Sequence, residues 1–190
     1  AAYYTKLMGE PIWLYQFRSL PYTELCAAGS GMLFGGLQSL VRRHPQLGRR
    51  LGRLLVPLVG FFTFALPFLK PLVGPLPDSI FAETWRGDVC LQSTPSTCGP
   101  ASAATLLRHF GIAVTERELA WECFSSRTGT ENWYLARALR KRGLDVKFVS
   151  AKPDSESLGA PAIAGVSADG FGHFIPLLSA TNGMVEVGDP

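Results

Sequence analysis

The sequence is poor in the cysteines and histidines that usually hold structural zinc, and it contains no P-loop motif. Its four cysteines (Cys26, Cys90, Cys98 and Cys123) form no CxxC pair, and the whole chain has three histidines. Structural zinc sites usually need closely spaced pairs of such residues, so the sequence argues against one. No P-loop signature occurs, which argues against ATP binding. No metal and no organic cofactor is therefore implied.

Charged residues are missing from two long stretches near the beginning of the chain. Residues 25–41 carry none, and residues 54–69 carry none before Lys70. About 20 apolar residues span a bilayer, so we predict two transmembrane segments, 25–41 and 54–76. The alternative is an amphipathic or re-entrant hairpin that lies on the membrane. Residues 1–77 are thus expected to form a membrane-associated region.

The charge of the chain is divided unevenly along its length. Residues 1–77 carry eight Lys and Arg against two acids, and residues 78–190 carry ten against thirteen. The basic excess lies beside apolar runs without interleaved aromatics, which favours a membrane face and argues against nucleic acid. Residues 42–53 hold five arginines between the two predicted spans. Because loops rich in Lys and Arg stay in the cytoplasm, we expect membrane localisation with residues 78–190 outside the cytoplasm.

Residues 78–190 read as a separate domain of α+β class, in which a helical lobe packs against an antiparallel sheet. Helices are predicted from Cys98 to Phe110, from a capping box at Thr115 and Glu118 through Phe124, and from a Thr130 cap through Arg142. Strands are predicted at 145–150, 161–166, 172–180 and 184–187, and Asn182–Gly183 is a hairpin turn between the last two. The domain is expected to continue past Pro190.

Cys98 opens the first of these helices. It is followed by Gly99 and Pro100, and proline is well tolerated in the first turn of a helix. The free amides and the dipole of a helix N-terminus stabilise a thiolate. A lone cysteine is more often a small core residue, so the interpretation of Cys98 as a nucleophile depends on finding a base and an orienting acid elsewhere.

Both partners occur in the predicted hairpin. His173 lies near the start of one strand, and Asp189 lies at the end of the strand that follows the Asn182–Gly183 turn. The two can face each other near the same end of the hairpin, where a carboxylate would hold the imidazole in one tautomer. Gln92 precedes Cys98 by one loop, so its amide and the Cys98 N–H could form an oxyanion hole. Each residue also has a non-catalytic interpretation: His173 as a satisfied strand histidine, Asp189 as a turn-capping acid and Gln92 as a solvated loop residue. The occurrence of all three together with Cys98 argues against these alternatives.

These residues resemble those of the bacteriocin-processing cysteine peptidases, papain-like domains that cleave after double-glycine leaders. The resemblance is carried by Gln92, by the Cys-Gly-Pro-Ala run from Cys98, by Gly-His-Phe around His173 and by Gly-Asp-Pro around Asp189. It implies that Cys98 is the nucleophile, His173 the general base and acid, Asp189 its orienting residue and Gln92 the oxyanion donor. It also implies a peptide or protein substrate and an export machinery as a partner.

The sequence departs from that family in two ways. In its export transporters the peptidase precedes the membrane helices, whereas here it follows them, and no ATP-binding signature is present. The family often has an acid just before the cysteine, where this chain has Thr97. Two other functions stay open: a non-catalytic peptide-binding module of a membrane complex, and a cysteine amidase or acyltransferase on the same fold.

Overall fold

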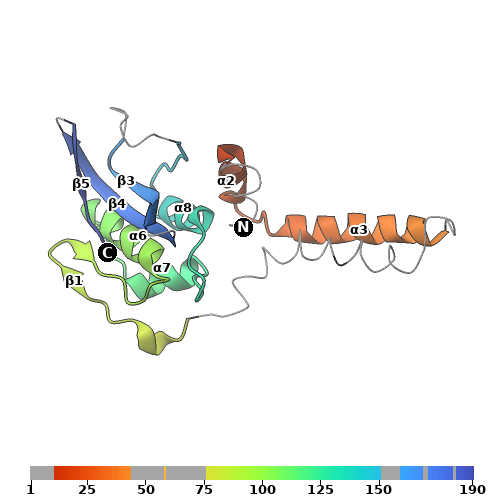
Figure 1. Ribbon diagram of the computed structural model, residues 1–190, viewed down its shortest axis with the longest axis horizontal. Helices are drawn as coiled ribbons and strands as arrows, with labels where there is room; N and C mark the ends of the chain where they lie inside the picture. Colours follow the sequence, from red (N-terminus) through yellow and green to blue (C-terminus); the bar gives the residue numbers. More distant parts are fainter. Residues whose placement is uncertain (1–10, 44–57, 59–75, 151–158, 169–170, 182) are drawn as a thin grey trace.

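The computed structural model describes residues 11–43, 58, 76–150, 159–168, 171–181 and 183–190 (Figure 1). Its helices are α2 (Ile12–Arg18), α3 (Leu25–Arg43), the short 3₁₀ helix η3 (Asp78–Ile80), α6 (Cys98–His109), α7 (Glu116–Glu122) and α8 (Asn132–Lys141). Its strands are β1 (Trp85–Arg86), β2 (Val89–Cys90), β3 (Ala162–Ala168), β4 (Phe171–Thr181) and β5 (Met184–Val187). Three helices precede a three-stranded antiparallel sheet, which confirms the α+β class.

Helix α6 forms the centre of the domain. Its first ten residues, 98–107, are all buried. Small side chains such as Ala101 and Ala104 allow α7, α8 and strand β4 to pack closely around it (Figure 1). The core that results is completed by Leu107 of α6 itself and by larger side chains from the surrounding helices, chiefly Leu119, Trp133 and Leu139.

The larger sheet has the order β3-β4-β5, with β4 in the middle. Val166 of β3 faces His173 of β4, and Leu177 of β4 faces Val187 of β5. The pairing of β4 with β5 contains an irregularity between Leu177 and Ser179. Gly183 in the connecting turn has a φ of +73°, a conformation that favours glycine and fits the predicted hairpin turn. A small hairpin of β1 and β2, which the sequence analysis did not predict, precedes α6.

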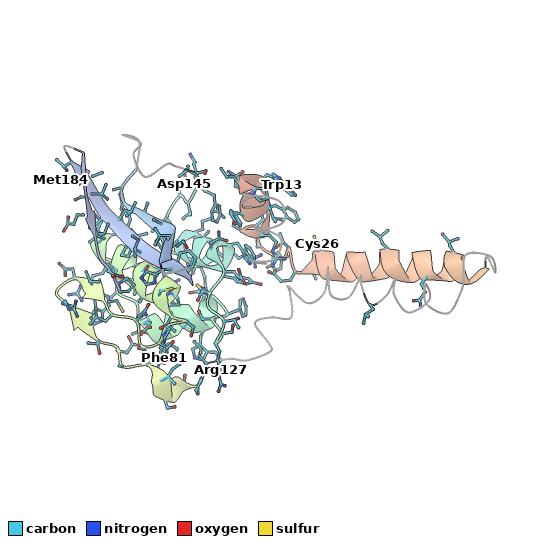
Figure 2. The ribbon with its side chains drawn as sticks, viewed as in Figure 1. Trp13, Cys26, Phe81, Arg127, Asp145 and Met184 are labelled. Atoms are coloured by element: carbon cyan, nitrogen blue, oxygen red, sulfur yellow. The ribbon has the colours of Figure 1, made fainter. Side chains whose placement is uncertain are left out.

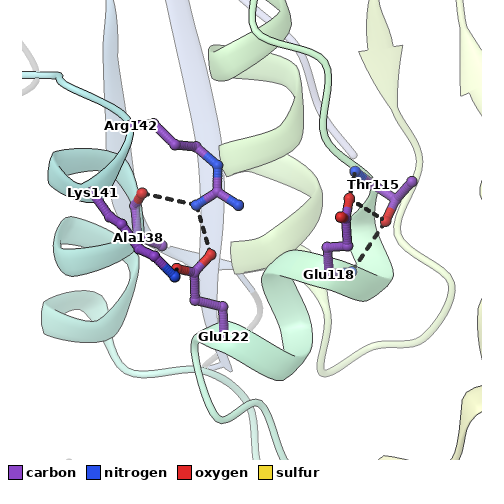
Figure 3. Close-up of polar contacts among 6 residues, drawn as sticks. All are labelled: Thr115, Glu118, Glu122, Ala138, Lys141 and Arg142. Carbon is purple, nitrogen blue, oxygen red and sulfur yellow. Dashed lines mark hydrogen bonds and ion pairs between the residues drawn. The ribbon is translucent and has the colours of Figure 1, made fainter.

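Polar side chains fix the beginning of α7 and join its end to α8 (Figure 3). The predicted capping box is confirmed: Thr115 Oγ1 accepts from the Glu118 N–H at 3.1 Å, and Glu118 Oε2 accepts from the Thr115 N–H at 3.0 Å. At the other end, Glu122 pairs with Lys141 at 2.8 Å and with Arg142 at 2.6 Å. These contacts therefore fix α7 and α8 relative to each other.

The segment that precedes the apolar helix α3 packs on the outer side of α8. The Tyr15 and Trp133 rings stack with their centroids 6.4 Å apart. Arg137 Nη2 donates to the carbonyl of Arg18 and to Thr23 Oγ1, both at 2.7 Å, and its Nη1 lies 2.9 Å from Glu24 Oε1. Residues 12–24 are therefore in contact with the C-terminal domain although they lie far from it in sequence.

Beyond Glu24 the chain leaves the domain as α3, which extends away from it (Figure 1). Apolar side chains on α3 are exposed, namely Leu25, Met32, Leu33 and Leu40. Within the described residues, no helix has the length and apolar character that a membrane crossing requires. The second predicted span, 54–76, lies outside the described residues except for positions 58 and 76.

Two local predictions were wrong. Residues 145–150 form no strand: the Val146 carbonyl accepts from Arg140 Nη2, and the Phe148 ring lies 5.7 Å from that of Tyr15, so this stretch packs on helices instead of the sheet. Thr130 does not cap α8, whose N-cap residue is Glu131. The Thr130 hydroxyl instead hydrogen-bonds Ser125 Oγ at 2.6 Å.

Candidate functional site

Cys98 is the first residue of α6, as predicted, and only 6% of it is exposed. Its predecessor Thr97 does not cap the helix, because the Thr97 hydroxyl turns back to donate to the Thr94 carbonyl at 3.0 Å. Pro100 has no N–H of its own, and Ala101 donates to the Thr97 carbonyl at 3.0 Å. The N-terminus of α6, where Cys98 lies, therefore has no side-chain cap, and the free amides of such a terminus favour an anion.

His173 and Asp189 come together as the sequence predicts. His173 Nε2 lies 2.9 Å from Asp189 Oδ1. The His173 side chain is 23% exposed, whereas that of Asp189 is 75% exposed. A carboxylate only accepts hydrogen bonds, so in this arrangement Nε2 carries the hydrogen and the neutral ring keeps its lone pair on Nδ1.

The beginning of α6 packs directly against the residue that follows His173. Ser102 Oγ donates to the Phe174 carbonyl at 2.9 Å. A Cβ on Gly99 would lie 3.3 Å from Phe174 Cδ2 and 3.1 Å from Leu135 Cδ1, tighter than most real Cβ contacts, so glycine next to Cys98 favours the close approach. Gly99 and Phe174 are in contact, and Cys98 and His173 directly precede them in the chain. This packing brings the thiol's helix terminus and the imidazole's strand to one place.

Asp189 is held by the residue before it. The Gly188 N–H donates to the Pro176 carbonyl at 3.0 Å, which extends the pairing with β4 beyond the end of β5. A Cβ on Gly188 would lie 2.9 Å from Val89 Cγ2, closer than real side-chain contacts allow. A larger residue at position 188 would therefore force either Val89 or the backbone that carries Asp189 to move, and glycine avoids this clash.

Gln92 lies in the loop between β2 and α6, and the backbone that precedes it is anchored by two hydrogen bonds. The Cys90 N–H donates to Thr105 Oγ1 of α6 at 2.9 Å, and the Leu91 N–H donates to the Thr84 carbonyl at 2.8 Å. The side-chain oxygen of Gln92 is buried and has no hydrogen-bond partner among the described residues. Because buried polar atoms are almost always paired, this unpaired amide oxygen calls for an explanation.

The two other cysteines of the domain are poorly suited to nucleophilic chemistry. Cys90 and Cys123 are fully buried. Burial raises the pKa of the Cys90 thiol to about 12, with a further contribution from the negative charge of Glu116. Burial likewise raises the pKa of Cys123 well above its ordinary value. Cys26 is exposed and lies at the start of α3, outside the core of the domain (Figure 2).

An α+β domain with a cysteine at the start of its central helix and a His–Asp pair on the adjoining sheet is a cysteine-peptidase-like domain. A model of the Peptidase C39 family matches residues 86–190. The chain belongs to this family, which confirms the resemblance to the bacteriocin-processing cysteine peptidases.

Two proteins from methanogen strains are similar to this chain over 110 residues. One, from Methanothermobacter thermautotrophicus, is 32% identical, and the other, from Methanothermobacter marburgensis, is 30% identical. In each case the match covers 57% of this chain and 76% of the relative. Both are named only as uncharacterized proteins, so they assign no activity. No solved structure matches the chain significantly.

Some residues that build the site could not be found from the sequence. Ser102 reads as one small residue among several in a helix, and its bond to Phe174 joins positions 72 residues apart. In the sequence, Gly188 stands out only as part of the Gly-Asp-Pro run. Its need for glycine arises from Val89, which belongs to the hairpin that was not predicted.

Proposed function

We propose that this chain is a cysteine peptidase in which Cys98 is the nucleophile, His173 the general base and acid, Asp189 the residue that orients His173, and Gln92 an oxyanion donor. The observation that carries the proposal is the 2.9 Å bond between His173 Nε2 and Asp189 Oδ1 on a strand that packs against the start of α6. Asp189 occupies Nε2, so Nδ1 is the nitrogen left for the thiol.

The reaction follows from these positions. His173 Nδ1 accepts the Cys98 proton, and the thiolate attacks the peptide carbonyl carbon to form a C–S bond. The carbonyl oxygen becomes an oxyanion, which the Cys98 N–H and the Gln92 side-chain amide stabilise. The C–N bond then breaks as the leaving amine takes the proton from His173. Water, deprotonated by His173, attacks the thioester and releases the acid, and the sulfur recovers its proton.

The substrate is proposed to be a peptide with a double-glycine leader. Family membership supports this class, because the family's characteristic cleavage follows two glycines. A binding module without activity would have no need of a thiol, a histidine and an acid in register. An amidase or acyltransferase would use the same residues, so the identity of the group that receives the acyl chain has to be measured.

Peptide turnover tests the proposal. The substrate is a peptide with two glycines before the scissile bond, and products are separated by mass for the full chain and for its Cys98→Ala and Cys90→Ala variants. We expect cleavage after the second glycine by the parent and by Cys90→Ala, and none by Cys98→Ala. Cleavage that survives in Cys98→Ala would contradict the assignment, and transfer of the acyl group to an added amine without hydrolysis would identify a transferase.

We also propose that residues 1–77 tether the domain to a membrane, with the domain outside the cytoplasm and residues 42–53 inside. The support is the five arginines of 42–53 and the exposed apolar side chains of α3. A tag after Pro190 should be degraded when protease is added to intact cells. A tag that survives until the membrane is permeabilised would place the domain inside and contradict this topology.

A further inference from the structure

A buried acid outside the proposed catalytic set holds the loop that carries Gln92. Glu116, the first residue of α7, is completely buried. Its Oε1 accepts from the Ser93 backbone N–H at 2.8 Å, and its Oε2 accepts from Ser93 Oγ at 2.5 Å. Among the residues that the structure describes, both hydrogen bonds to this carboxylate therefore come from the residue directly after Gln92.

The geometry fixes the peptide group that links Gln92 to Ser93. The N–H that Glu116 binds belongs to that peptide group, so its plane is set by the carboxylate. Ser93 Oγ, while donating to Glu116, also accepts from the Ala82 N–H at 2.9 Å, which prevents the serine from rotating away. On the other side of Gln92, the Thr84 carbonyl holds the N–H of the Cys90–Leu91 peptide group, one residue further along. Gln92 is thus the unanchored side chain between two anchored peptide groups.

Burying a carboxylate only to hold a loop in place would carry a large free-energy cost. Burial of a charged group carries a penalty of several kcal/mol unless strong hydrogen bonds compensate for it. Hydrogen bonds to an ionised acceptor are shorter and roughly twice as strong as neutral ones. Such strong, paired bonds are appropriate where a donor must stay within a fraction of an ångström of its working position.

We propose that Glu116 is the positioning residue of the oxyanion donor, acting through Ser93 to hold Gln92 in place; this rests on the proposed role of Gln92. Glu116 touches neither the thiol nor the substrate. Its loss should therefore slow the steps that pass through an oxyanion and leave the nucleophilicity of Cys98 unchanged.

Two reagents separate these effects in the full chain. Acylation of Cys98 by p-nitrophenyl acetate passes through a tetrahedral oxyanion, whereas alkylation by iodoacetamide displaces iodide from a saturated carbon and forms none. Both rates are measured for the parent, Glu116→Gln, Gln92→Ala and the double variant, with Cys98→Ala as the blank. Glu83→Gln is the matched control, because Glu83 also binds the start of α7, at the N–H groups of Glu116 and Arg117, but makes no bond to Ser93.

We expect Gln92→Ala to slow acylation by about 10²–10³-fold, the usual effect of losing one oxyanion donor. Glu116→Gln should slow acylation by at least about tenfold, in line with the effect of a displaced catalytic group, and add no further loss in the Gln92→Ala background. Alkylation should stay within about twofold of the parent in both, and Glu83→Gln should acylate at the parent rate.

Equal losses of acylation and alkylation in Glu116→Gln, or a loss of the same size in the Gln92→Ala background, would overturn the proposal. If Glu116→Gln does not fold, Ser93→Ala removes the Oγ bonds alone and must show the same selective loss of acylation. Unchanged acylation in Gln92→Ala would overturn the oxyanion role and this inference together, whereas acylation that persists in Cys98→Ala would overturn the proposed nucleophile itself.

Discussion

At the scale of single residues, the hydrogen-bond partner of His173 Nε2 determines whether Nδ1 can act as a proton acceptor. Asp189 Oδ1 accepts a hydrogen bond from His173 Nε2 at 2.9 Å, although the Asp189 side chain is 75% exposed. Exposed ion pairs contribute little free energy because water screens them. The proposed role of Asp189 is therefore to orient the ring and select its tautomer, and we expect its contribution to the stability of the fold to be small.

If Asp189 acts by orienting the His173 ring and not by its negative charge, two substitutions of Asp189 should have different outcomes. Asp189→Asn keeps an oxygen that accepts from Nε2–H, so kcat should fall by no more than about tenfold, whereas Asp189→Ala should lower it by about 10². Steady-state turnover of a double-glycine peptide measures both. Unfolding midpoints should be unchanged in both variants. If Asn and Ala lower kcat equally, the carboxylate acts by its charge and the orienting role is wrong.

The residues that could be predicted from the sequence are those tied to a local pattern. Cys98 follows from the glycine and proline after it, and the pairing of His173 with Asp189 follows from counting outward from a hairpin turn. Glu116 and Ser102 could not be predicted, because their partners Ser93 and Phe174 lie 23 and 72 residues away in the chain. Such contacts depend on how helices and sheet pack, which no local pattern specifies.

At the scale of elements, the contact between α7 and α8 depends on protonation. Burial alone would raise the pKa of Glu122, but the hydrogen bonds from Lys141 and Arg142 outweigh it and lower that pKa below its ordinary value (Figure 3). A lowered folded-state pKa stabilises the protein above the unfolded value of about 4.3, and this stabilisation is lost as the pH falls through the folded value.

Glu122→Gln should therefore lower the free energy of unfolding by about 1 kcal/mol at pH 7 and by clearly less at pH 3. Urea unfolding at the two pH values measures the difference. Glu118→Gln is the control, since glutamine also completes a capping box and should be nearly neutral at pH 7. A Glu122→Gln effect that is the same at both pH values would show that the ion pairs are not its source.

A single glycine after β5 connects the hairpin to the site. In Gly188→Ala, the new methyl group would meet Val89 Cγ2 at 2.9 Å, and we expect the clash to displace the backbone that carries Asp189. We expect kcat to fall by about tenfold or more. Gly165→Ala on β3 is the matched control, because its methyl group would make an ordinary 3.6 Å contact with Phe174. Equal activity in the two variants would refute the positioning role of Gly188.

Among the predicted elements, one local sequence pattern predicted the structure and another did not. Thr115 and Glu118 form a capping box within one turn, so the sequence was enough to predict it. Residues 145–150 have the composition of a strand, but the Val146 carbonyl binds Arg140 and Phe148 packs on Tyr15. Strand propensity depends strongly on context, and here packing on the helices prevails.

At the scale of the whole molecule, residues 12–24 belong physically to the domain although they lie on the far side of the apolar region. Tyr15 packs on Trp133, and Arg18 lies over the same indole ring at 4.8 Å. The family match begins at residue 86, so a domain cut near there would expose this face of α8. Helix α3 begins directly after this segment, at Leu25, and extends away from the domain (Figure 1).

Two aromatic residues of α2 test this contact. Tyr15→Ala should lower the free energy of unfolding by about 1–3 kcal/mol, because it removes contacts with Trp133 and Phe148. Trp13→Ala should change it by less than about 0.5 kcal/mol, because Trp13 is 65% exposed (Figure 2). Denaturant unfolding of the full chain measures both. Equal effects would show that residues 12–24 act only as a connection.

The central claim, that Cys98 is a nucleophile activated by His173, is tested most directly by site-resolved labelling. A peptidyl chloromethyl ketone that ends in two glycines is added to the folded chain at pH 7, and modified cysteines are identified by mass spectrometry over time. We predict that Cys98 is labelled first, that Cys90, with a pKa of about 12, and Cys123 stay unlabelled, and that His173→Ala slows the labelling of Cys98 by about 10² or more. Labelling of the exposed Cys26 as fast as Cys98, or a Cys98 rate that His173→Ala leaves unchanged, would contradict the account.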